Sequence, residues 1–272
     1  MSQQTYYELR VLSSNPQLLS DLAFELGISA IEQINGGFII RDEGELDAIE
    51  FGLKTFAQKA NIDITTSITQ KQNSDWIAAY QNAVKPVQCG RFYIRPSWCE
   101  AKNDESIDII IDPALAFGSG HHESTSSCLK LISKYASDLG GKNALDLGCG
   151  SGILSIALAK LGLKVDALDT DEQAISSTLA NVAKNGVSIN NAIIGSIQKT
   201  SASYDMICAN IIADVILALA NDLKSRLKDG GYLILSGILN RYKERIMDSF
   251  KDLKCLENIT KNEWESFIFI KN

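Results

Sequence analysis

The sequence has 272 residues, of which 45% are hydrophobic and 22% are charged, a composition typical of a globular protein with one or two cores. No apolar run is long enough to cross a bilayer and no signal peptide is evident, so we expect a cytoplasmic protein without a membrane partner. The net charge of −7 argues against direct binding of nucleic acid. Six scattered cysteines without a CxxC pair indicate reduced thiols, with neither a disulfide framework nor a zinc site.

Most of the excess negative charge lies in the first quarter of the chain. Residues 1–70 contain ten acidic and four basic side chains, a net charge of −6. Such a segment repels nucleic acid and attracts basic partners. Simple solubility is the alternative explanation, and charge alone favours it slightly.

The first domain is expected over residues 1–69. Its predicted elements are a strand over 7–11, a helix over 16–26, a hairpin around 35–37, a helix over 46–56 and a strand over 62–68. Asn15 is the expected N-cap of the first helix, and Gly27 stops it. The order β-α-β-β-α-β predicts a small ferredoxin-like α+β domain, a fold that by itself implies no particular function.

Residues 70–122 are expected to join this domain to a second one over 123–272. The stretch "QKQNSD", 70–75, is polar and aperiodic, as in a linker, and a short helix and a strand follow between Trp76 and Trp98. The second domain then alternates strands and helices, with strands expected over 143–147, 164–169, 191–194, 204–209, 231–236, 254–259 and 264–270. The pattern predicts a doubly wound α/β sheet, closed by an antiparallel last hairpin, whose ligand crevice lies at the carboxyl ends of the strands.

The stretch "ALDLGCGSG", 144–152, ends a strand in three glycines and raises the question of what that loop binds. A P-loop needs Gly-Lys-Ser/Thr at the start of its helix, but Ile153 follows Gly152, so that reading fails. A dinucleotide loop is harder to dismiss, because Asp169 lies about twenty residues further on, where an acid would hold a ribose. The spacing here is G-x-G-x-G, from Gly148 to Gly152, whereas a dinucleotide loop has G-x-G-x-x-G. A difference of one position is weak evidence against a dinucleotide.

Charge decides between these ligands. Asp146 ends the strand two residues before Gly148, and no Lys or Arg occurs over 143–159. A pyrophosphate there would meet a carboxylate, whereas a cationic ligand would be favoured. S-adenosylmethionine fits, since it carries an ammonium, a sulfonium and a ribose diol for Asp169. The alternative for Asp146 is a plain strand-end cap.

At this point the sequence resembles a known family. "LDLGCGSG" and "ALDTD" look like the class I methyltransferase signature, a Rossmann-like fold. "DPALAFGSGHHESTSSCLKLI", "ANIIADVI", "LSGIL", "RPSW" and "EWESFIF" are similar to the methyltransferases of large-subunit ribosomal protein L-eleven (L11), the PrmA family. The resemblance covers the chain from about residue 70 to its end. It extends more loosely over the N-terminal module, which in that family grips the substrate.

The resemblance implies cofactor contacts at Thr125, Gly148, Asp169 and Asn210. To these the loop itself adds Asp146 and Gly150, and Phe117 is expected to pack on the cofactor. Each has an ordinary alternative: an early helix residue for Thr125, a solvated carboxylate for Asp169, and a core side chain for Phe117.

Asn210 is the expected catalytic residue. It follows the apolar strand "YDMICA", and an amide there faces the crevice, where it can hold an amine's N–H and aim its lone pair at a methyl group. Its alternative is the cap of a helix beginning near Ile212. Ile211 and Ile212 replace the prolines and aromatic clamp of N-P-P-Y, a pattern suited to planar amides, which favours a flexible aliphatic amine. His122, one of two histidines, either acts as a base or shapes its loop, and a metal site is not expected.

The resemblance thus implies methyl transfer from S-adenosylmethionine to lysine side chains and the N-terminal amine of L11. The acidic N-terminal module would hold this basic protein. Three alternatives remain: a class I methyltransferase acting on RNA or a small molecule, a ribosome-associated binding protein without catalysis, and a dehydrogenase.

Overall fold

The computed structural model describes residues 5–28, 31–42, 44, 46–72, 85–112 and 122–272. The chain divides into two compact units, residues 1–84 and 85–272, and each is described by itself. Phe117 and the helix expected after Trp76 lie outside the described residues. Within the described part of the chain, no helix is both long enough and apolar enough to span a membrane.

The N-terminal unit has the predicted ferredoxin-like order of elements. Its antiparallel sheet runs β2-β3-β1-β4, and its elements are β1 (Thr5–Ser13), α1 (Pro16–Glu25), β2 (Glu32–Ile34), β3 (Gly37–Asp42), α2 (Asp47–Ala60) and β4 (Ile64–Gln72). Asn15 caps α1 through a bond that its side chain accepts from the backbone N–H of Leu18. Leu9 and Val11 pack with both helices in the core, because alternate residues of β1 point to the same face.

The other face of β1 carries an ion cluster around the buried carboxylate of Glu8. The carboxylate of Glu8 accepts hydrogen bonds from Arg41 at 2.9 Å and from Lys71 at 2.8 Å. Burial raises the pKa of Glu8, but these two cations outweigh burial and leave the pKa below its usual value. β4 runs to Gln72, past the strand end expected at residue 68 and into the stretch expected to be a linker. Pairing with β1 and the ion pair of Lys71 with Glu8 override the low strand propensity of these polar residues, and β4 forms the edge of the sheet.

The second unit begins with a small sheet of β5 (Val87–Cys89), β6 (Phe92–Arg95) and β7 (Ile107–Ile110), in that order. The side-chain amide of Asn185 completes its open edge. Asn185 accepts from the N–H of Ile110 at 2.8 Å and donates to the carbonyl of Ile110 at 2.7 Å. The small sheet is thus attached to the C-terminal end of α6 and forms part of the second unit.

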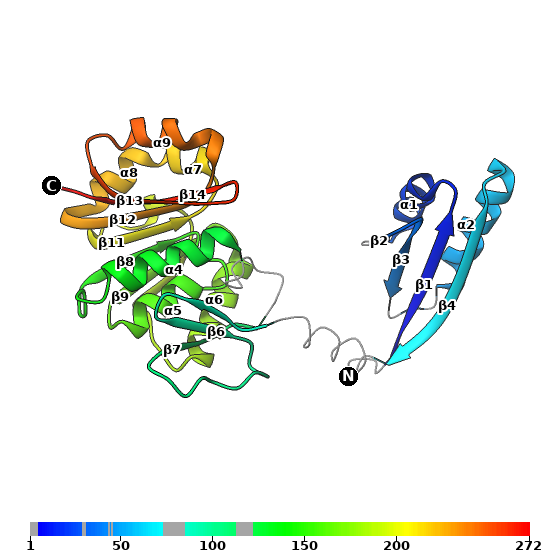
Figure 1. Cartoon of the computed structure of the whole chain (residues 1–272), viewed down its shortest axis with the longest axis horizontal. Coiled ribbons are helices and arrows are strands. Elements are labelled where there is room, and N and C mark those ends of the chain that lie inside the picture. The colour runs from blue at the N-terminus through cyan, green and yellow to red at the C-terminus, as the bar shows by residue number, and fades with distance from the viewer. Residues whose placement is uncertain (1–4, 29–30, 43, 45, 73–84, 113–121) are drawn as a thin grey trace. The chain divides into compact units, whose positions relative to one another are not determined.

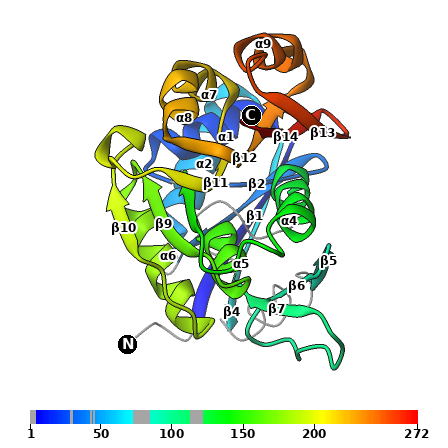
Figure 2. The same ribbon diagram turned by 90° about the vertical axis from the view of Figure 1, so that its left-hand side faces the viewer.

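The central sheet has the order β10-β9-β8-β11-β12-β14-β13 in the described part of the chain (Figures 1 and 2). Its strands are β8 (Asn143–Leu147), β9 (Lys164–Asp169), β10 (Asn191–Ile194), β11 (Tyr204–Asn210), β12 (Leu227–Leu239), β13 (Lys254–Lys261) and β14 (Trp264–Ile270). The strands from β8 to β12 pair in parallel, and β14 is antiparallel to β12 and β13, as predicted. The sheet is doubly wound, with the reversal of strand order between β8 and β11.

Helices cover both faces of this sheet (Figure 1). One layer consists of α4 (Glu123–Tyr135), α5 (Ile153–Lys160) and α6 (Glu172–Lys184), and the other of α7 (Ala213–Ala218), α8 (Ala220–Arg226) and α9 (Lys243–Ser249), with short 3-10 turns at Ile197–Lys199 and Asn240–Tyr242. Because alternate strand residues face opposite layers, Cys208 packs with the first layer and Ala209 with the second. Two apolar cores hold the sheet between them and fix the positions of its strand ends.

Candidate functional site

The loop after β8 adopts a backbone that only glycine accommodates easily. Gly148, Gly150 and Gly152 have φ angles of +77°, +53° and +79°. A Cβ at Gly148 would lie 2.2 Å from the side chain of Ile211, and one at Gly152 would lie 2.9 Å from Thr178. The glycines therefore let β8 turn sharply into α5 and let the neighbouring segments approach the loop closely.

Asp169, at the carboxyl end of β9, holds the glycine loop. One carboxylate oxygen accepts from the backbone N–H of Gly150 at 3.0 Å, and the other accepts from the backbone N–H of Asp171 at 3.1 Å. The N–H groups of Gly148 and Cys149 both donate to the carbonyl of Leu168, at 2.7 and 3.1 Å. The two strand ends are thus locked together, with a half-buried carboxylate facing the crevice.

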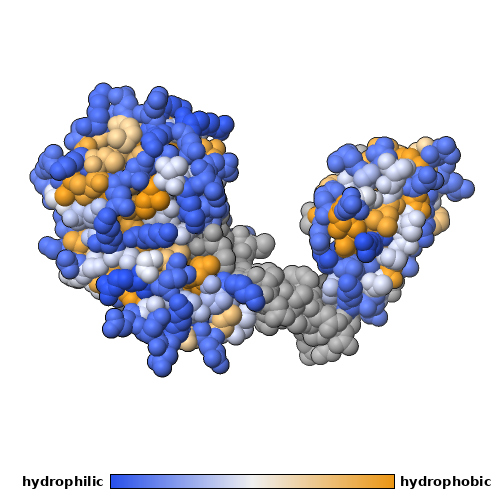
Figure 3. All heavy atoms as spheres, viewed as in Figure 1, coloured by the Kyte–Doolittle hydropathy of each residue, from blue (hydrophilic) through white to orange (hydrophobic). Residues whose placement is uncertain are grey.

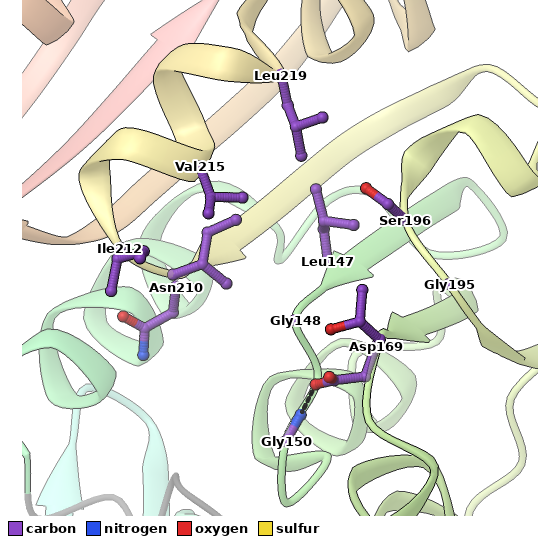
Figure 4. Close-up of a pocket in the computed structure, with 12 residues that line it drawn as sticks. Leu147, Gly148, Gly150, Asp169, Gly195, Ser196, Asn210, Ile212, Val215 and Leu219 are labelled. Atoms are coloured by element: carbon purple, nitrogen blue, oxygen red, sulfur yellow. Dashed lines mark hydrogen bonds between the residues drawn. The ribbon is translucent and has the colours of Figure 1, made fainter.

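A cavity of about 370 Å³ lies over these strand ends. Its described lining is Leu147, Gly148, Gly150, Asp169, Thr170, Gly195, Ser196, Asn210, Ile211, Ile212, Val215 and Leu219. Asn210 and Asp169 lie on opposite sides of Gly148 (Figure 4). The size suits a small molecule, and no Lys or Arg is among the described lining residues, so this cavity favours a neutral or cationic ligand over a phosphate.

Asp146 lies beneath the loop and does not line the cavity. It is fully buried, and one carboxylate oxygen accepts from the backbone N–H of Ser155 at 2.9 Å and from its hydroxyl at 2.6 Å. Asp146 therefore caps the first turn of α5, which is the alternative that the sequence left open. Its other carboxylate oxygen has no partner among the described residues, and the expected contact of Asp146 with a ligand stays a prediction.

Burial raises the pKa of Asp146 from 3.8 to about 6, against the hydrogen bonds from Ser155, and the nearby charge of Asp169 adds to the rise. The folded protein thus binds this proton more tightly than the unfolded chain does. The stability contributed by the protonated carboxyl is fully present below about pH 4 and is lost as the pH rises through about 6, a loss of roughly 3 kcal/mol.

We expect Asp146→Asn to flatten the pH dependence of the free energy of unfolding between about pH 4 and 7, measured by chemical denaturation. Asp205→Asn is the matched control. Burial raises the pKa of Asp205, but the bonds from Lys228 and from the N–H of Asn143 outweigh it and lower that pKa. Its stabilisation is lost only as the pH falls below about 4, so this control should leave the slope between pH 4 and 7 nearly unchanged. An unchanged slope in Asp146→Asn would contradict the prediction.

Asn210 ends β11 on the other side of the glycine loop. Its amide Nδ2 donates to the hydroxyl of Thr125 at 3.2 Å, a residue 85 positions earlier in α4. Its Oδ1 is buried and has no hydrogen-bond partner among the described residues. Asn210 does not cap α7, whose N-cap, Ile212, has no capping side chain. An oriented amide with a vacant acceptor at a strand end is suited to bind an N–H donor.

The start of α4 holds two further predicted residues, Thr125 and His122. Thr125 is buried, does not line the cavity and orients Asn210. His122 is the N-cap of α4, and its Nδ1 accepts from the N–H of Ser124 at 3.3 Å.

Among the predicted site residues, Gly148, Gly150, Asp169 and Asn210 therefore line one cavity. Sequence reasoning missed the apolar part of its wall, which comes from Leu147, Val215 and Leu219, and the small residues Gly195 and Ser196 after β10. Of these residues, only Gly195 and Ser196 could have been found from the sequence. They directly follow the strand expected over 191–194, and the carboxyl ends of parallel strands lie at the same edge of the sheet as Asp169.

Comparison with known proteins identifies the family. A family model described as "Ribosomal protein L11 methyltransferase (PrmA)" matches residues 38–272. The ribosomal protein L11 methyltransferase of Campylobacter fetus subsp. fetus is 59% identical over 266 residues, 98% of this chain and 96% of that protein. The protein of the same name from Campylobacter concisus is 51% identical, over 97% of each chain. The chain belongs to the PrmA family.

A solved structure agrees with this assignment. The ribosomal protein L11 methylase from Lactobacillus delbrueckii subsp. bulgaricus is 27% identical and superposes with a TM-score of 0.64, covering 70% of this chain and 100% of that one. The resemblance noted in the sequence and the predicted class I methyltransferase fold are both confirmed. As a PrmA-family protein, the chain is a methyltransferase, which sets aside the dehydrogenase and the binding protein without catalysis.

Proposed function

We propose that this PrmA-family enzyme transfers methyl groups from S-adenosylmethionine to amino groups of ribosomal protein L11, both lysine side chains and the N-terminal amine. The observation that carries the acceptor chemistry is the buried Oδ1 of Asn210, which has no hydrogen-bond partner among the residues that the structure describes. The names of its relatives support L11 as the substrate. The two relatives described above are named ribosomal protein L11 methyltransferase, and this chain matches 96% and 97% of their length.

The residues around the cavity fit S-adenosylmethionine. Asp169 would accept hydrogen bonds from the ribose hydroxyls, and the backbone at Gly148 and Gly150 would lie against the ligand, because no Cβ stands in the way. Asp146 favours positive charge from beneath the loop, where one of its carboxylate oxygens has no partner within the described ranges. When bound, S-adenosylmethionine supplies an activated methyl group on a positively charged sulfur.

Asn210 has the acceptor chemistry for the amine. Its Nδ2 is held by Thr125, so its Oδ1 is the atom left to accept an N–H and to orient the nitrogen lone pair. A free lysine with a pKa near 10.4 is uncharged only about once in a few thousand molecules at neutral pH. Exclusion of water by the apolar walls favours the neutral amine, so the site needs no dedicated base. Alignment and desolvation are the contributions of the protein.

The first experiment incubates the enzyme with S-adenosylmethionine and purified L11, and then measures the intact mass of L11. We expect increases in whole methyl steps that require both the enzyme and the methyl donor. Parallel reactions with ribosomal RNA and with free lysine test the two alternatives. Transfer to RNA, or to free lysine but not to L11, would overturn the proposed substrate.

We further propose that the N-terminal unit recognises L11 through its acidic surface. Asp21, Asp42, Asp47 and Asp63 are exposed on this unit. Apolar side chains accompany them: Leu18, Phe24, Leu26 and Phe51 are exposed, and Figure 3 shows apolar atoms on the visible face of this unit beside hydrophilic ones. A basic protein would be attracted by these carboxylates and would then bury apolar surface.

Replacing these four aspartates by asparagine is expected to slow association with L11 about tenfold at low salt, and to reduce the salt dependence of that rate. Association is measured by stopped-flow fluorescence with labelled L11. The matched control neutralises Asp138, Asp229, Asp248 and Asp252, which are exposed on the second unit. Equal slowing in both quadruple variants would show that net charge alone acts, against recognition by the N-terminal unit.

A further inference from the structure

The dipeptide Asn-Gly occurs twice in the sequence, as Asn35-Gly36 and as Asn185-Gly186. Such a pair has a reaction of its own, in which the backbone nitrogen of the glycine attacks the side-chain amide carbon of the asparagine. Glycine favours this attack because no Cβ hinders the approach of its nitrogen. The amide must still be free to turn toward that nitrogen, so the surroundings of each pair decide whether it reacts.

The first pair forms the turn of the hairpin between β2 and β3 (Figure 1). Ile34 pairs with Gly37, which leaves Asn35 and Gly36 at the tip of the turn, and both are exposed. Within the described part of the chain, the side chain of Asn35 has no hydrogen-bond partner and the N–H of Gly36 donates to no group. The amide carbon and the attacking nitrogen are therefore both free to meet.

The second pair, at the end of α6, is held in place by hydrogen bonds. The Oδ1 of Asn185 accepts from the N–H of Ile110 at 2.8 Å, and its Nδ2 donates to the carbonyls of Ile110 at 2.7 Å and of Asn181 at 2.9 Å. The N–H of Gly186 donates to the carbonyl of Ala183 at 3.1 Å. Attack at this pair requires that these bonds break first, so the protein carries its own matched control for the first pair.

We propose that Asn35 is a site of spontaneous covalent modification, at which the side-chain amide is lost as ammonia, and that one of the two products loosens the β2–β3 hairpin. Hydroxide removes the proton of the Gly36 nitrogen, and that nitrogen forms a bond to the Cγ of Asn35. The Cγ–Nδ2 bond then breaks, and the leaving nitrogen takes up a proton from water and departs as ammonia. Water opens the resulting cyclic succinimide at either carbonyl, which gives aspartate or its β-linked isomer, isoaspartate. The inference does not depend on the proposed function.

The two products differ in how they fit the turn. Aspartate keeps the backbone of asparagine and is itself a common turn residue, so it adds only a negative charge. Isoaspartate adds a methylene group to the backbone between Ile34 and Gly37. The hairpin has little room for it, because a Cβ at Gly37 would lie 1.9 Å from the carbonyl oxygen of Val11, and the carbonyl of Gly36 accepts from the N–H of Ser13 at 3.0 Å. Isoaspartate therefore weakens the pairing of this hairpin with β1.

The reaction is tested on the full-length protein, incubated in water enriched in oxygen-18 at about pH 6 and at about pH 9, because base removes the amide proton. Peptides are then measured by mass spectrometry, in which incorporated heavy oxygen marks conversion during the incubation. We expect the Asn35 peptide to convert about 100-fold faster than the Asn185 peptide, whose amide is held by hydrogen bonds, and faster at the higher pH. In denaturant the two peptides should convert at similar rates. Equal rates in the folded protein, or a difference that persists in denaturant, would overturn the proposal.

Two variants complete the test. In Asn35→Gln the amide remains but its carbon is one methylene further from the chain, so the acidic species that accumulates in the parent on isoelectric focusing should be absent. Equal accumulation in both proteins would place the reaction elsewhere in the chain.

Asn35→Asp is the reference for the second part of the proposal, since it carries the new charge on an ordinary backbone. Its midpoint of chemical denaturation should match that of the parent, whereas the isoaspartate-containing fraction of the aged parent, separated by chromatography, should unfold at lower denaturant. An isoaspartate fraction as stable as Asn35→Asp would refute the loosening of the hairpin.

Discussion

Asn210→Ala is expected to lower kcat for methylation of L11 about 10²–10³-fold, the size of effect seen when one preorganised hydrogen-bonding group is removed from an active site. The reason is specific to the geometry of Asn210. Its Oδ1 is buried and has no partner in the part of the chain that the structure describes, so the acceptor is already desolvated and already oriented before the amine arrives. Single-turnover methylation, followed by intact mass, measures the rate.

Two measurements show whether this loss comes from the acceptor. Calorimetry with S-adenosylhomocysteine should give an affinity within about threefold of the parent, since Asn210 is only one of the residues around the cavity. Thr125→Val removes the hydroxyl that receives the Nδ2 of Asn210 and should cost about tenfold in kcat, while Thr125→Ser should retain it. An Asn210→Ala enzyme with nearly the parent kcat would refute the catalytic role.

Asp169→Ala is expected to weaken binding of S-adenosylhomocysteine about 100-fold, measured by calorimetry. The change would remove the acceptors for a ribose and would also release the N–H of Gly150, which Asp169 now holds at 3.0 Å. The glycine loop would then lose the bond that ties it to β9. Asp169→Asn keeps one acceptor and should fall between the two affinities.

Asp171→Ala is the matched control for this prediction. Asp171 lies two residues further on, and its side chain accepts from the N–H of Gln173 to cap α6, outside the described lining of the cavity. Its loss should cost about 1 kcal/mol of stability and leave the affinity for the ligand unchanged. If Asp169→Ala binds S-adenosylhomocysteine as tightly as Asp171→Ala does, Asp169 does not hold the ribose.

Much of the fold could be predicted from local sequence patterns. The strands over 143–147, 164–169, 191–194 and 264–270 have the predicted bounds, because each is a short run rich in apolar residues that is bounded by turn residues. β12 is longer than predicted, running over 227–239. Its ends contain glycines and charged residues of low strand propensity, and pairing with neighbouring strands overrides that preference.

The sequence by itself determined the family, the glycine loop and the strand-end positions of Asp169 and Asn210. These features depend on residue type and on spacing within about twenty positions, which the chain carries locally. It did not determine what the side chains at those positions do. Asp146 has the residue type of a ligand-binding acid, yet its place beneath the loop makes it a buried helix cap.

Only the tertiary structure decided the contacts between distant segments. Thr125 lies 85 residues before Asn210, and the space that His122, Gly237 and Trp264 line beside that amide needs α4, β11, β12 and β14 together. Such contacts depend on how two helical layers pack on a twisted sheet, which no local pattern encodes. The Oδ1 of Asn210, which lacks a partner among the described residues, and the close approach of Gly237 to it both depend on those elements meeting at one edge of the sheet.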